Sequence, residues 1–375
     1  MTKRMKYDLD APGTRERTDQ IVHGAFVTQG SMVAFPPCFP AVTLPVPADE
    51  CHITALDVTA DGIVYAGTSG YAAHLLVGMF HGVTGMVLDM GVVEGANQTA
   101  AICCAQGKVV AAVNGPHGGR LVLRELQPLP FDLIQEWHIG QAPYQVLSEV
   151  VPGEKIQHAV ADATKQKVVG LTEGHLFVLD VETAQVAVVG QVAGRGRLAL
   201  RPDNTVLGMD EGATLWAYDV GKGALSRRAV ELPQGNWAMP ALMWARDLVD
   251  GTLYTADADG MIYSFALDSG FTCQTKTPIA PVGPMAVTLD GRLFGTMGEG
   301  MSKLFCYDPA SRQVTSLGVA VSVFERRRYG YTFGDAAVGR DGEIILGEDD
   351  DLGHLWLYFP RIQTGRVRPR QGGQG

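Results

Sequence analysis

Long apolar runs are missing from this sequence. No stretch approaches the roughly 18 apolar residues of a membrane-spanning helix, and the N-terminal text MTKRMKYDLDAPGTRERTDQ lacks the apolar core of a secretory signal. We therefore expect a cytoplasmic protein that does not enter a membrane. Cysteine is scarce as well: the 375 residues include 6, without a CxxC pair, so neither a disulfide framework nor a cysteine zinc site is predicted.

Basic residues are in the minority. The chain has 30 Lys and Arg against 40 Asp and Glu, which gives a net charge of −10. Proteins that bind nucleic acids or membrane surfaces present basic faces, so neither partner is expected. A local arginine cluster could still hold an anionic ligand in such a protein. The GxSxG elbow, the P-loop and the GxGxxG turn are absent too, which removes the common hydrolase and nucleotide-binding signatures.

What the sequence does contain is a repeat. A nine-residue phrase occurs seven times, and each copy joins a turn-forming pair to an apolar run of strand length. The copies are DGIVYAGTS from Asp61, QGKVVAAVN from Gln106, KQKVVGLTE from Lys165, DNTVLGMDE from Asp203, DGTLYTADA from Asp250, DGRLFGTMG from Asp290 and DGEIILGED from Asp341. A second apolar phrase follows each copy after a short polar loop. Strand pairs repeated every 38 to 59 residues predict an all-β, seven-bladed β-propeller.

The ends of the repeat suggest how the ring closes. The last blade finishes at HLWLYFP and is followed only by a polar tail, so it lacks its own outermost strand. We expect the N-terminal segment to supply that strand, with AVTLPVP (41–47) as the candidate, because this pairing removes a sheet edge. The predicted regions are a mobile arm over 1–20, one propeller over 21–363 and a disordered tail over 364–375.

Strand alternation places the functional loops at one end of the propeller. The loops between second and third strands share a rim with the connections to the next blade, whereas the DG-type turns lie on the opposite rim. The first rim is rich in titratable and aromatic residues, so the site is predicted there. Its candidates are His74, Asn97, His117, His158, His175, Arg195, Arg197, Trp237, Arg328, Tyr329, Tyr331 and His354. The repeated Asp residues of the other rim are predicted to form turns.

The histidines have two interpretations. His74, His175 and His354 begin their third strands at equivalent places, and a residue repeated by blade position is often structural. His117 lies in GPHGG, where glycines allow a ligand to approach closely. His158 stands near the start of an inner strand and could belong to the core. Histidines from several blades could also hold a divalent cation, the candidate cofactor, although no HxH or HxxxH spacing supports this.

The other candidates also have a structural and a functional interpretation. Trp237 in GNWAMP could plug the channel or stack on a sugar. Arg328 belongs to an arginine run that could be a solvated loop, or an anion clamp with Tyr329 and Tyr331 beside it, because arginine binds carboxylates in a bidentate manner. Neither the WD dipeptide nor the Kelch double glycine is present. Their absence disfavours a propeller devoted only to protein interaction.

Two phrases, DGIVYAGTSGYAAHLL and DGEIILGEDDDLGHLWLYFP, resemble blades of the seven-bladed propeller polysaccharide lyases, a group that includes oligogalacturonate and ulvan lyases. The resemblance covers most of the chain as architecture. It implies β-elimination of a saccharide that contains uronic acid, with His or Tyr as base and acid and an Arg, Gln or metal ion on the uronate. No individual residue is assigned by it.

The residues are compatible with this chemistry. The proton next to a carboxylate becomes acidic only when a cation neutralises the carboxylate, and Arg328, Arg197 or a bound metal could do so. His117 with Tyr329 or Tyr331 is the candidate base and acid pair. The predicted binding residues for an acidic saccharide are His74, Asn97, His175, Arg195, Arg197, Trp237 and His354. The alternatives are a metal-dependent lactonase or hydrolase, with Glu299, Glu348 or Asp210 on the cation, and a non-catalytic propeller that binds a glycan or a protein.

Overall fold

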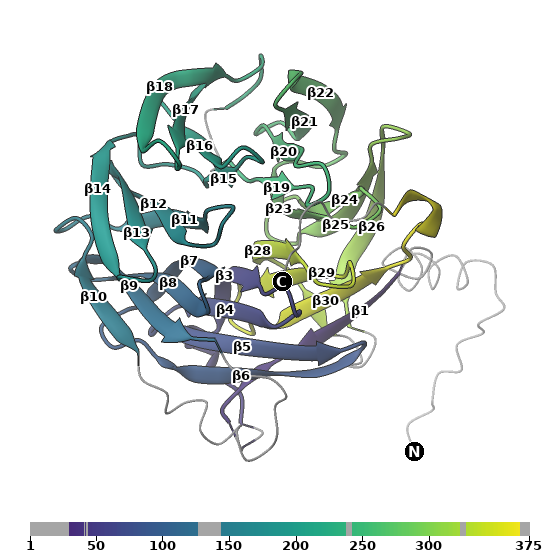
Figure 1. The fold of residues 1–375 in the computed structure, drawn as a ribbon. Coiled ribbons are helices and arrows are strands. Elements are labelled where there is room, and N and C mark those ends of the chain that lie inside the picture. Colours follow the sequence, from purple (N-terminus) through teal and green to yellow (C-terminus); the bar gives the residue numbers. More distant parts are fainter. Residues whose placement is uncertain are drawn as a thin grey trace, which may run out of the picture.

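A computed structural model describes residues 30–40, 42, 44–126, 144–237, 242–322 and 328–367. Apart from two short 3₁₀ turns, the regular structure of these residues is β, in seven sheets arranged around a central axis (Figure 1). The predicted all-β, seven-bladed propeller is thus confirmed. No helix in the described ranges is long and apolar enough to cross a membrane.

Each blade consists of antiparallel strands that follow one another from the axis outward. Blade 1 contains β3 (His52–Val58), β4 (Val64–Ser69), β5 (His74–His81) and β6 (Thr84–Val92). Blade 2 contains β7 (Gln98–Ala105), β8 (Lys108–Gly115), β9 (Gly118–Glu125) and β10 (Gln145–Glu149). Blade 3 contains β11 (Ile156–Ala161), β12 (Lys167–Thr172), β13 (His175–Asp180) and β14 (Gln185–Gln191). Blade 4 contains β15 (Ala199–Leu200), β16 (Thr205–Met209), β17 (Thr214–Asp219) and β18 (Ala224–Glu231).

The remaining blades follow the same order. Blade 5 contains β19 (Ala245–Arg246), β20 (Leu253–Ala256), β21 (Met261–Ala266) and β22 (Gly270–Lys276). Blade 6 contains β23 (Val282–Val287), β24 (Leu293–Met297), β25 (Lys303–Asp308), β26 (Gln313–Val321) and the short β27 (Tyr329–Gly330). Blade 7 contains β28 (Phe333–Val338), β29 (Ile344–Glu348) and β30 (Leu355–Pro360), with β1 (Gly30–Phe35) outermost.

The nine-residue phrase owes its form to a turn and to a packing requirement. Its turn residues adopt the left-handed conformation that a tight hairpin needs, with φ of 91° at Gly62 and 61° at Asn204. In three copies the mid-strand glycine faces an aromatic ring on the third strand: Gly170, Gly208 and Gly295. A Cβ on Gly170 would lie 2.0 Å from the Phe177 ring, its cross-strand partner. The small residue in the phrase therefore makes room for the aromatic residue of the next strand.

The N-terminal segment closes the ring, as predicted, but through different residues. β1 pairs antiparallel with β30, from Gly30 opposite Pro360 to Phe35 opposite Leu355. β2 (Pro37–Cys38) then pairs parallel with β6 of blade 1, so the segment fastens blade 7 to blade 1. The prediction of AVTLPVP as the closing strand is wrong; of its described residues, Pro45 only bridges Cys38. GSMVAF can bury side chains on both faces and has no proline to interrupt the hydrogen-bond ladder.

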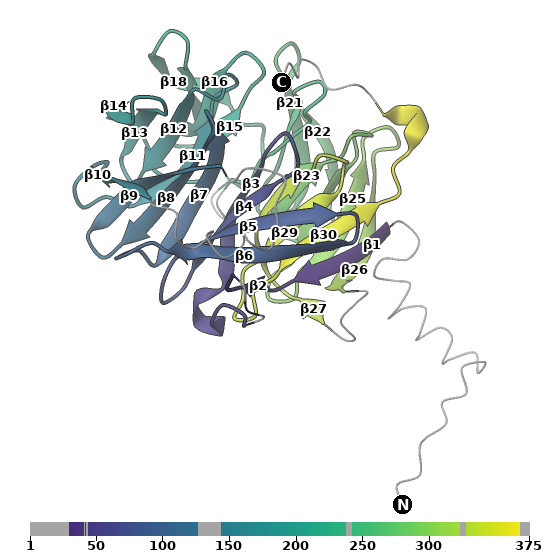
Figure 2. The ribbon, with the colours of Figure 1, turned by 60° about the horizontal axis from the view of Figure 1, so that its bottom comes forward.

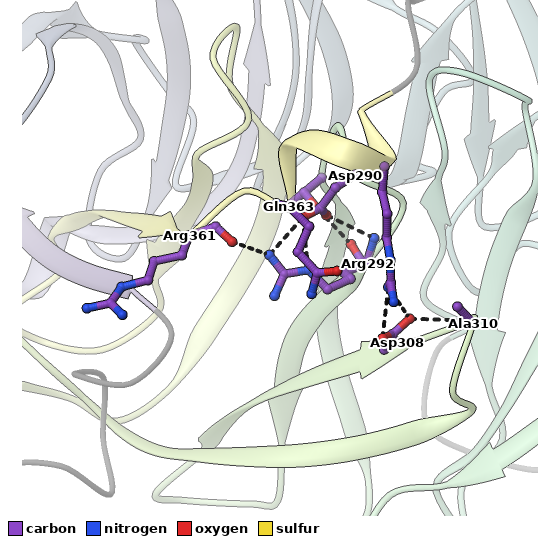
Figure 3. Close-up of polar contacts among 8 residues, drawn as sticks. Asp290, Arg292, Asp308, Ala310, Arg361 and Gln363 are labelled. Carbon is purple, nitrogen blue, oxygen red and sulfur yellow. Dashed lines mark hydrogen bonds and ion pairs between the residues drawn. The ribbon is translucent and has the colours of Figure 1, made fainter.

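Residues 361–367 dock on blade 6. Figure 3 shows Arg292 and Asp290, a buried pair at the hairpin between β23 and β24, beneath residues 361–367. Arg292 Nη2 donates to the Arg361 carbonyl at 2.7 Å, and the Gln363 N–H donates to Asp290 at 2.9 Å. Arg366, in the 3₁₀ turn η4 (Thr364–Arg366), pairs with Asp308 at 2.9 Å. The predicted boundary at residue 363 falls inside this docked segment, while the predicted arm and residues 368–375 lie outside the described ranges.

Candidate functional site

The two ends of the propeller differ in the way the repeat predicts. We call the end with the loops between second and third strands the loop rim, and the end with the hairpins after the inner strands the turn rim. In Figure 2 the 3₁₀ turn η2 (Ala48–Glu50) and β27 lie at the lower side, toward the loop rim, and η4 lies toward the other end.

His74 is a buried bridge between two carboxylates. Its Nδ1 lies 3.0 Å from Asp89 Oδ1 and its Nε2 lies 2.8 Å from Glu50 Oε2, so both ring nitrogens are occupied. Burial opposes the imidazolium charge, but the hydrogen bonds to Asp89 and Glu50 outweigh it and raise the pKa of His74. The side chain is 1% exposed. It therefore has no ring nitrogen left for a saccharide.

His175 is held in a similar but more open way. Its Nδ1 lies 2.9 Å from Glu154 Oε1, and Glu154 also accepts the Thr172 hydroxyl and the Gly174 N–H. Burial opposes the carboxylate charge, yet the hydrogen bonds from Thr172, His175 and Gly174 lower the pKa of Glu154. Glu154 organises the loop between β12 and β13, and the repeated histidine position has a structural role in this blade.

The Arg328–Glu348–His354 cluster is the part of the predicted site that the fold does bring together. Arg328 Nη2 donates to Glu348 Oε2 at 2.5 Å and lies 2.9 Å from His354 Nδ1. Glu348 also accepts from Trp356 Nε1 at 3.0 Å and is fully buried. Burial raises the pKa of Glu348 to about 7, whereas burial and the Arg328 charge lower the pKa of His354 to about 4. Arg328 thus pairs with the protein's own carboxylate, where the sequence suggested an anionic ligand.

The remaining candidates are distributed around the ring. His117 is exposed in the turn between β8 and β9 of blade 2, and Asn97 is exposed between blades 1 and 2. Arg195 donates to the carbonyls of Asp210 and Gly212 in blade 4. Trp237 donates to the Pro233 carbonyl at 2.7 Å and stacks beside Tyr263, with 5.1 Å between ring centroids.

The proposed base and acid lie on different blades. His117 belongs to blade 2, while Tyr329 and Tyr331 lie at the passage from blade 6 to blade 7. Blade 1 stands between blades 7 and 2. Within the described residues no hydrogen bond links His117 to either tyrosine. Of the arginine run, only Arg328 falls in the described ranges.

Arg197 turned out to lie in the central channel. It comes from the connection between blades 3 and 4 and forms an ion pair with Asp335 of blade 7, and it also donates to the Gly334 carbonyl at 2.5 Å. Blades 4 and 7 stand on opposite sides of a ring of seven, so this bridge spans the channel. His158 lies beside it: burial and the Arg197 charge lower the pKa of His158 well below its ordinary value. Sequence reasoning did not foresee this bridge, because its ends are 138 residues apart.

No group of three or more His, Cys, Asp or Glu side chains in the described part of the chain is arranged to hold a metal ion. Glu348 and Asp210, two of the acids proposed for a cation, are engaged elsewhere. Glu348 belongs to the cluster described above, and Asp210 accepts the Arg228 N–H at 2.9 Å and lies 3.4 Å from Arg227 Nη1. The divalent cation stays a prediction.

The loop rim also exposes large apolar side chains, of which Tyr331 was already a candidate from the sequence. They are Tyr71 in blade 1, Met301 in blade 6, Tyr331 at the passage to blade 7 and Leu352 in blade 7. Tyr71 is 82% exposed and Leu352 57%. A hollow of about 270 Å³ lies beside them, between blades 5 and 7, lined by Phe333, Thr332 and Glu299 among others.

Comparison with known proteins adds the fold but no family. No protein-family model matches the chain, and no curated protein matches its sequence. Among solved structures, the crystal structure of the RRP9 WD40 repeats has the same architecture, with a TM-score of 0.58, 8% identity, and coverage of 89% of this chain and 99% of that chain. At this identity the likeness concerns the fold alone.

Replacing His74 by alanine tests whether its role is structural. The change leaves Asp89 and Glu50 without their shared partner, and we expect a loss of about 3 kcal/mol in the free energy of unfolding. His175→Ala, at a more exposed pair, should cost less than about 1 kcal/mol. Urea denaturation of both variants measures the difference. Equal stabilities would contradict the buried bridge.

Proposed function

We propose that the protein is a non-catalytic binding propeller that docks a segment of a protein partner on the loop rim of blades 6, 7 and 1. The observation that carries this proposal is the set of exposed apolar side chains Met301, Tyr331, Leu352 and Tyr71, which we call the docking surface together with the acidic loop 349–351. Large apolar side chains that gather on one exposed region are typical of interaction sites.

Backbone hydrogen bonds connect the loops that carry the docking surface in blades 6 and 7. The Ser302 N–H donates to the Tyr331 carbonyl at 2.7 Å, which joins the Met301 loop to the passage between blades 6 and 7. The Asp349 N–H donates to the Thr332 carbonyl at 3.0 Å, and this bond joins that passage to the loop of Leu352. These bonds fix the backbone of the loops that carry the exposed side chains, which lowers the entropic cost of binding.

On the side of blade 1, loop 349–351 continues the surface toward Tyr71. His52 Nδ1 lies 3.1 Å from Asp349 Oδ1, and His52 Nε2 lies 3.2 Å from Asp351 Oδ1. The Tyr71 N–H donates to the Asp49 carbonyl at 2.7 Å, which places Tyr71 against η2. The His52 contacts tie loop 349–351 to the start of blade 1, the blade whose loop carries Tyr71.

The charges of the described residues indicate what kind of segment fits. Asp351 is almost fully solvent-exposed; it precedes the apolar Leu352 in its loop and pairs with His52 of blade 1. Arg328, the described arginine that contacts this region through the Leu352 carbonyl, already faces Glu348. A partner segment with apolar side chains next to Lys or Arg would complement this arrangement.

Catalysis receives less support from the same geometry. β-Elimination needs a base, an acid and a cation around one carbon atom. His74, His175 and His354 are held by the protein's own groups, and His117 is on another blade than Tyr329 and Tyr331. The lyase hypothesis on an acidic saccharide is tested by incubating the protein with uronic-acid oligosaccharides, with and without chelator. A rise in the ultraviolet absorbance of an unsaturated product would replace the binding proposal by an enzymatic one.

The docking surface is tested by selecting displayed random peptides on the immobilised full chain. We expect the selected peptides to combine aliphatic or aromatic residues with Lys or Arg. Leu352→Asp should weaken their binding at least about tenfold in fluorescence anisotropy, because it puts a charge at the centre of an apolar contact. Leu267→Asp is the matched control, since Leu267 is exposed to a similar degree in the turn between β21 and β22 on the turn rim.

Two results would count against the proposal. One is a selection that yields no binders. The other is a set of binders that tolerate Leu352→Asp as well as they tolerate Leu267→Asp, which would place the contact elsewhere.

A further inference from the structure

A second polar region lies inside the ring, away from the docking surface. The central channel contains a cavity of about 280 Å³, lined by the inner strands of every blade except blade 6. Most of its lining residues are Ala, Leu, Ile or Val, but polar and apolar atoms share its surface about equally. Besides the buried thiol of Cys103, its titratable residues are Asp57, His158, Lys165, Arg197, Arg246 and Asp335. Neither the repeat nor the docking surface accounts for them.

The cavity carries more positive than negative groups. Three side chains are cationic, Lys165, Arg197 and Arg246, against the two carboxylates Asp57 and Asp335. His158 does not add a charge at neutral pH, because burial and Arg197 lower its pKa. A chain with a net charge of −10 thus encloses a cavity with a positive excess. Such an excess in a partly apolar surrounding attracts anions more strongly than it would in water.

The two ends of the channel are not equivalent. Toward the loop rim, Arg197 is satisfied by Asp335 and the Gly334 carbonyl, and this bridge spans the channel. Toward the turn rim stand Lys165, in the hairpin between β11 and β12, and Arg246, at the end of β19. The unsatisfied charge is therefore at the turn rim.

Arg246 is the residue that most needs a partner. Its guanidinium group makes no hydrogen bond or ion pair with any described residue, and the Nε atom is buried without an acceptor. Trp244 Nε1, from the residue just before β19, is also buried without an acceptor. Both residues line the cavity. A buried N–H without an acceptor is costly, so two of them on one cavity indicate a missing acceptor.

Lys165 is only loosely satisfied. Its Nζ lies 4.0 Å from Asp57 Oδ2, and its side chain is 54% exposed. Asp57 is itself engaged, because Oδ2 accepts the Cys104 N–H at 2.7 Å and Oδ1 accepts the Val58 N–H at 2.8 Å. The carboxylate thus serves the backbone of blades 1 and 2 and leaves the ammonium group free to bind another anion.

We infer that the turn-rim half of the channel is a binding site for a small oxyanion, a carboxylate or a phosphate group, held by Arg246 and Lys165 with Trp244 as an additional donor. Arginine and lysine supply charge-assisted hydrogen bonds to such oxygens, and the indole N–H supplies a neutral one. The cavity volume lies near the lower limit of the roughly 300–1,000 Å³ typical of ligand pockets, so the ligand is a small metabolite and not a polymer. The site lies across the ring from the docking surface and does not depend on it.

Isothermal titration of the full chain at low ionic strength tests this site. Inorganic phosphate and glucuronate are the two probes, and glucose is the neutral control. We expect binding of at least one anion and none of glucose; which anion binds more tightly decides between phosphate and carboxylate. Arg246→Gln should weaken that binding by roughly tenfold to a hundredfold, the usual effect of losing a charge-assisted hydrogen bond.

Lys165→Gln provides a second variant if Arg246→Gln does not fold, because the Lys165 side chain is half exposed in a hairpin. This substitution should also weaken the binding of the anion, because it removes one of the two positive charges in the site. Lys222→Gln, an exposed lysine in blade 4, is the matched control and should bind like the wild-type protein. Absence of heat with both anions, or wild-type affinity in Arg246→Gln and Lys165→Gln, would overturn the inference.

Discussion

Replacing Arg292 by alanine is expected to lower the free energy of unfolding by about 3–5 kcal/mol, the usual cost of removing one partner from a buried ion pair. Arg292 Nε and Nη2 donate to Asp290 Oδ2 at 3.0 and 2.8 Å, and the Asp290 side chain is fully buried. Burial opposes the Asp290 charge, but the hydrogen bonds from Arg292 and from the Gln363 N–H lower the pKa of Asp290. Without the guanidinium, a buried carboxylate would remain unpaired. Urea denaturation at neutral pH measures the loss.

Two controls make the Arg292 prediction specific. Removing both charges with Asp290→Asn and Arg292→Leu should cost less than Arg292→Ala alone, because no unpaired charge is left behind. Lys222→Ala breaks the exposed pair with Asp219, whose atoms are 2.7 Å apart, and should hardly move the denaturation midpoint. The buried-pair interpretation fails if Arg292→Ala behaves like Lys222→Ala.

In the buried cluster of Arg328, Glu348 and His354, two groups are expected to change the free energy of unfolding with pH in opposite directions. The pKa of Glu348 is raised from 4.5 to about 7, mainly by burial, although Trp356 and Arg328 oppose the shift. The pKa of His354 is lowered from 6.5 to about 4 by burial and by the Arg328 charge. Asp350 also faces both groups and favours their protonation. Folding therefore gives Glu348 a proton and takes one from His354.

The directions follow from linkage between protonation and folding. The contribution of Glu348 to stability is present below pH 4.5 and is lost as the pH rises through about 7. The contribution of His354 is present above pH 6.5 and is lost as the pH falls through about 4. Between these limits each group changes the stability by up to about 1.4 kcal/mol per pH unit, with opposite signs. In the wild-type protein the two slopes offset one another.

Single substitutions should expose each slope. Glu348→Gln leaves only the histidine, so its stability is expected to fall as the pH drops from 6.5 toward 4. His354→Asn leaves only the carboxyl group, so its stability is expected to fall as the pH rises from 4.5 toward 7. Urea midpoints measured across this range, relative to the wild-type curve, provide the test. Two variants with the same pH profile as the wild-type protein would show that the cluster does not exchange protons on folding.

Most of the fold could be predicted from the repeat. Turn pairs such as those at Gly62 and Asn204 and the apolar runs after them are local signals, and a hairpin forms within its own residues. Gly170 and its aromatic partner Phe177 also lie on neighbouring strands and are close in sequence. The blade number, the order of strands and the difference between the two rims could be predicted for this reason.

The closing strand and the site could not be predicted in the same way. Several segments near the N-terminus have an apolar pattern, and only the finished ring shows that Gly30–Phe35 fits against β30. The predicted site residues were chosen by their loops, yet His74 and Arg328 turned out to face carboxylates of the protein itself. The position of a residue in a loop predicts the rim on which it lies. It does not predict which group its side chain contacts.

The sequence by itself determined the architecture, because the period of apolar residues and the turn chemistry act over a few neighbouring residues. Only the tertiary structure decided how the charges are used. Arg197 pairs with Asp335 across the channel, and Asp290 is buried with Arg292 under residues 361–367. The Arg246 side chain has no partner in the cavity. These outcomes depend on which side chains of distant blades meet when the ring closes, and electrostatic interactions follow those distances and that burial.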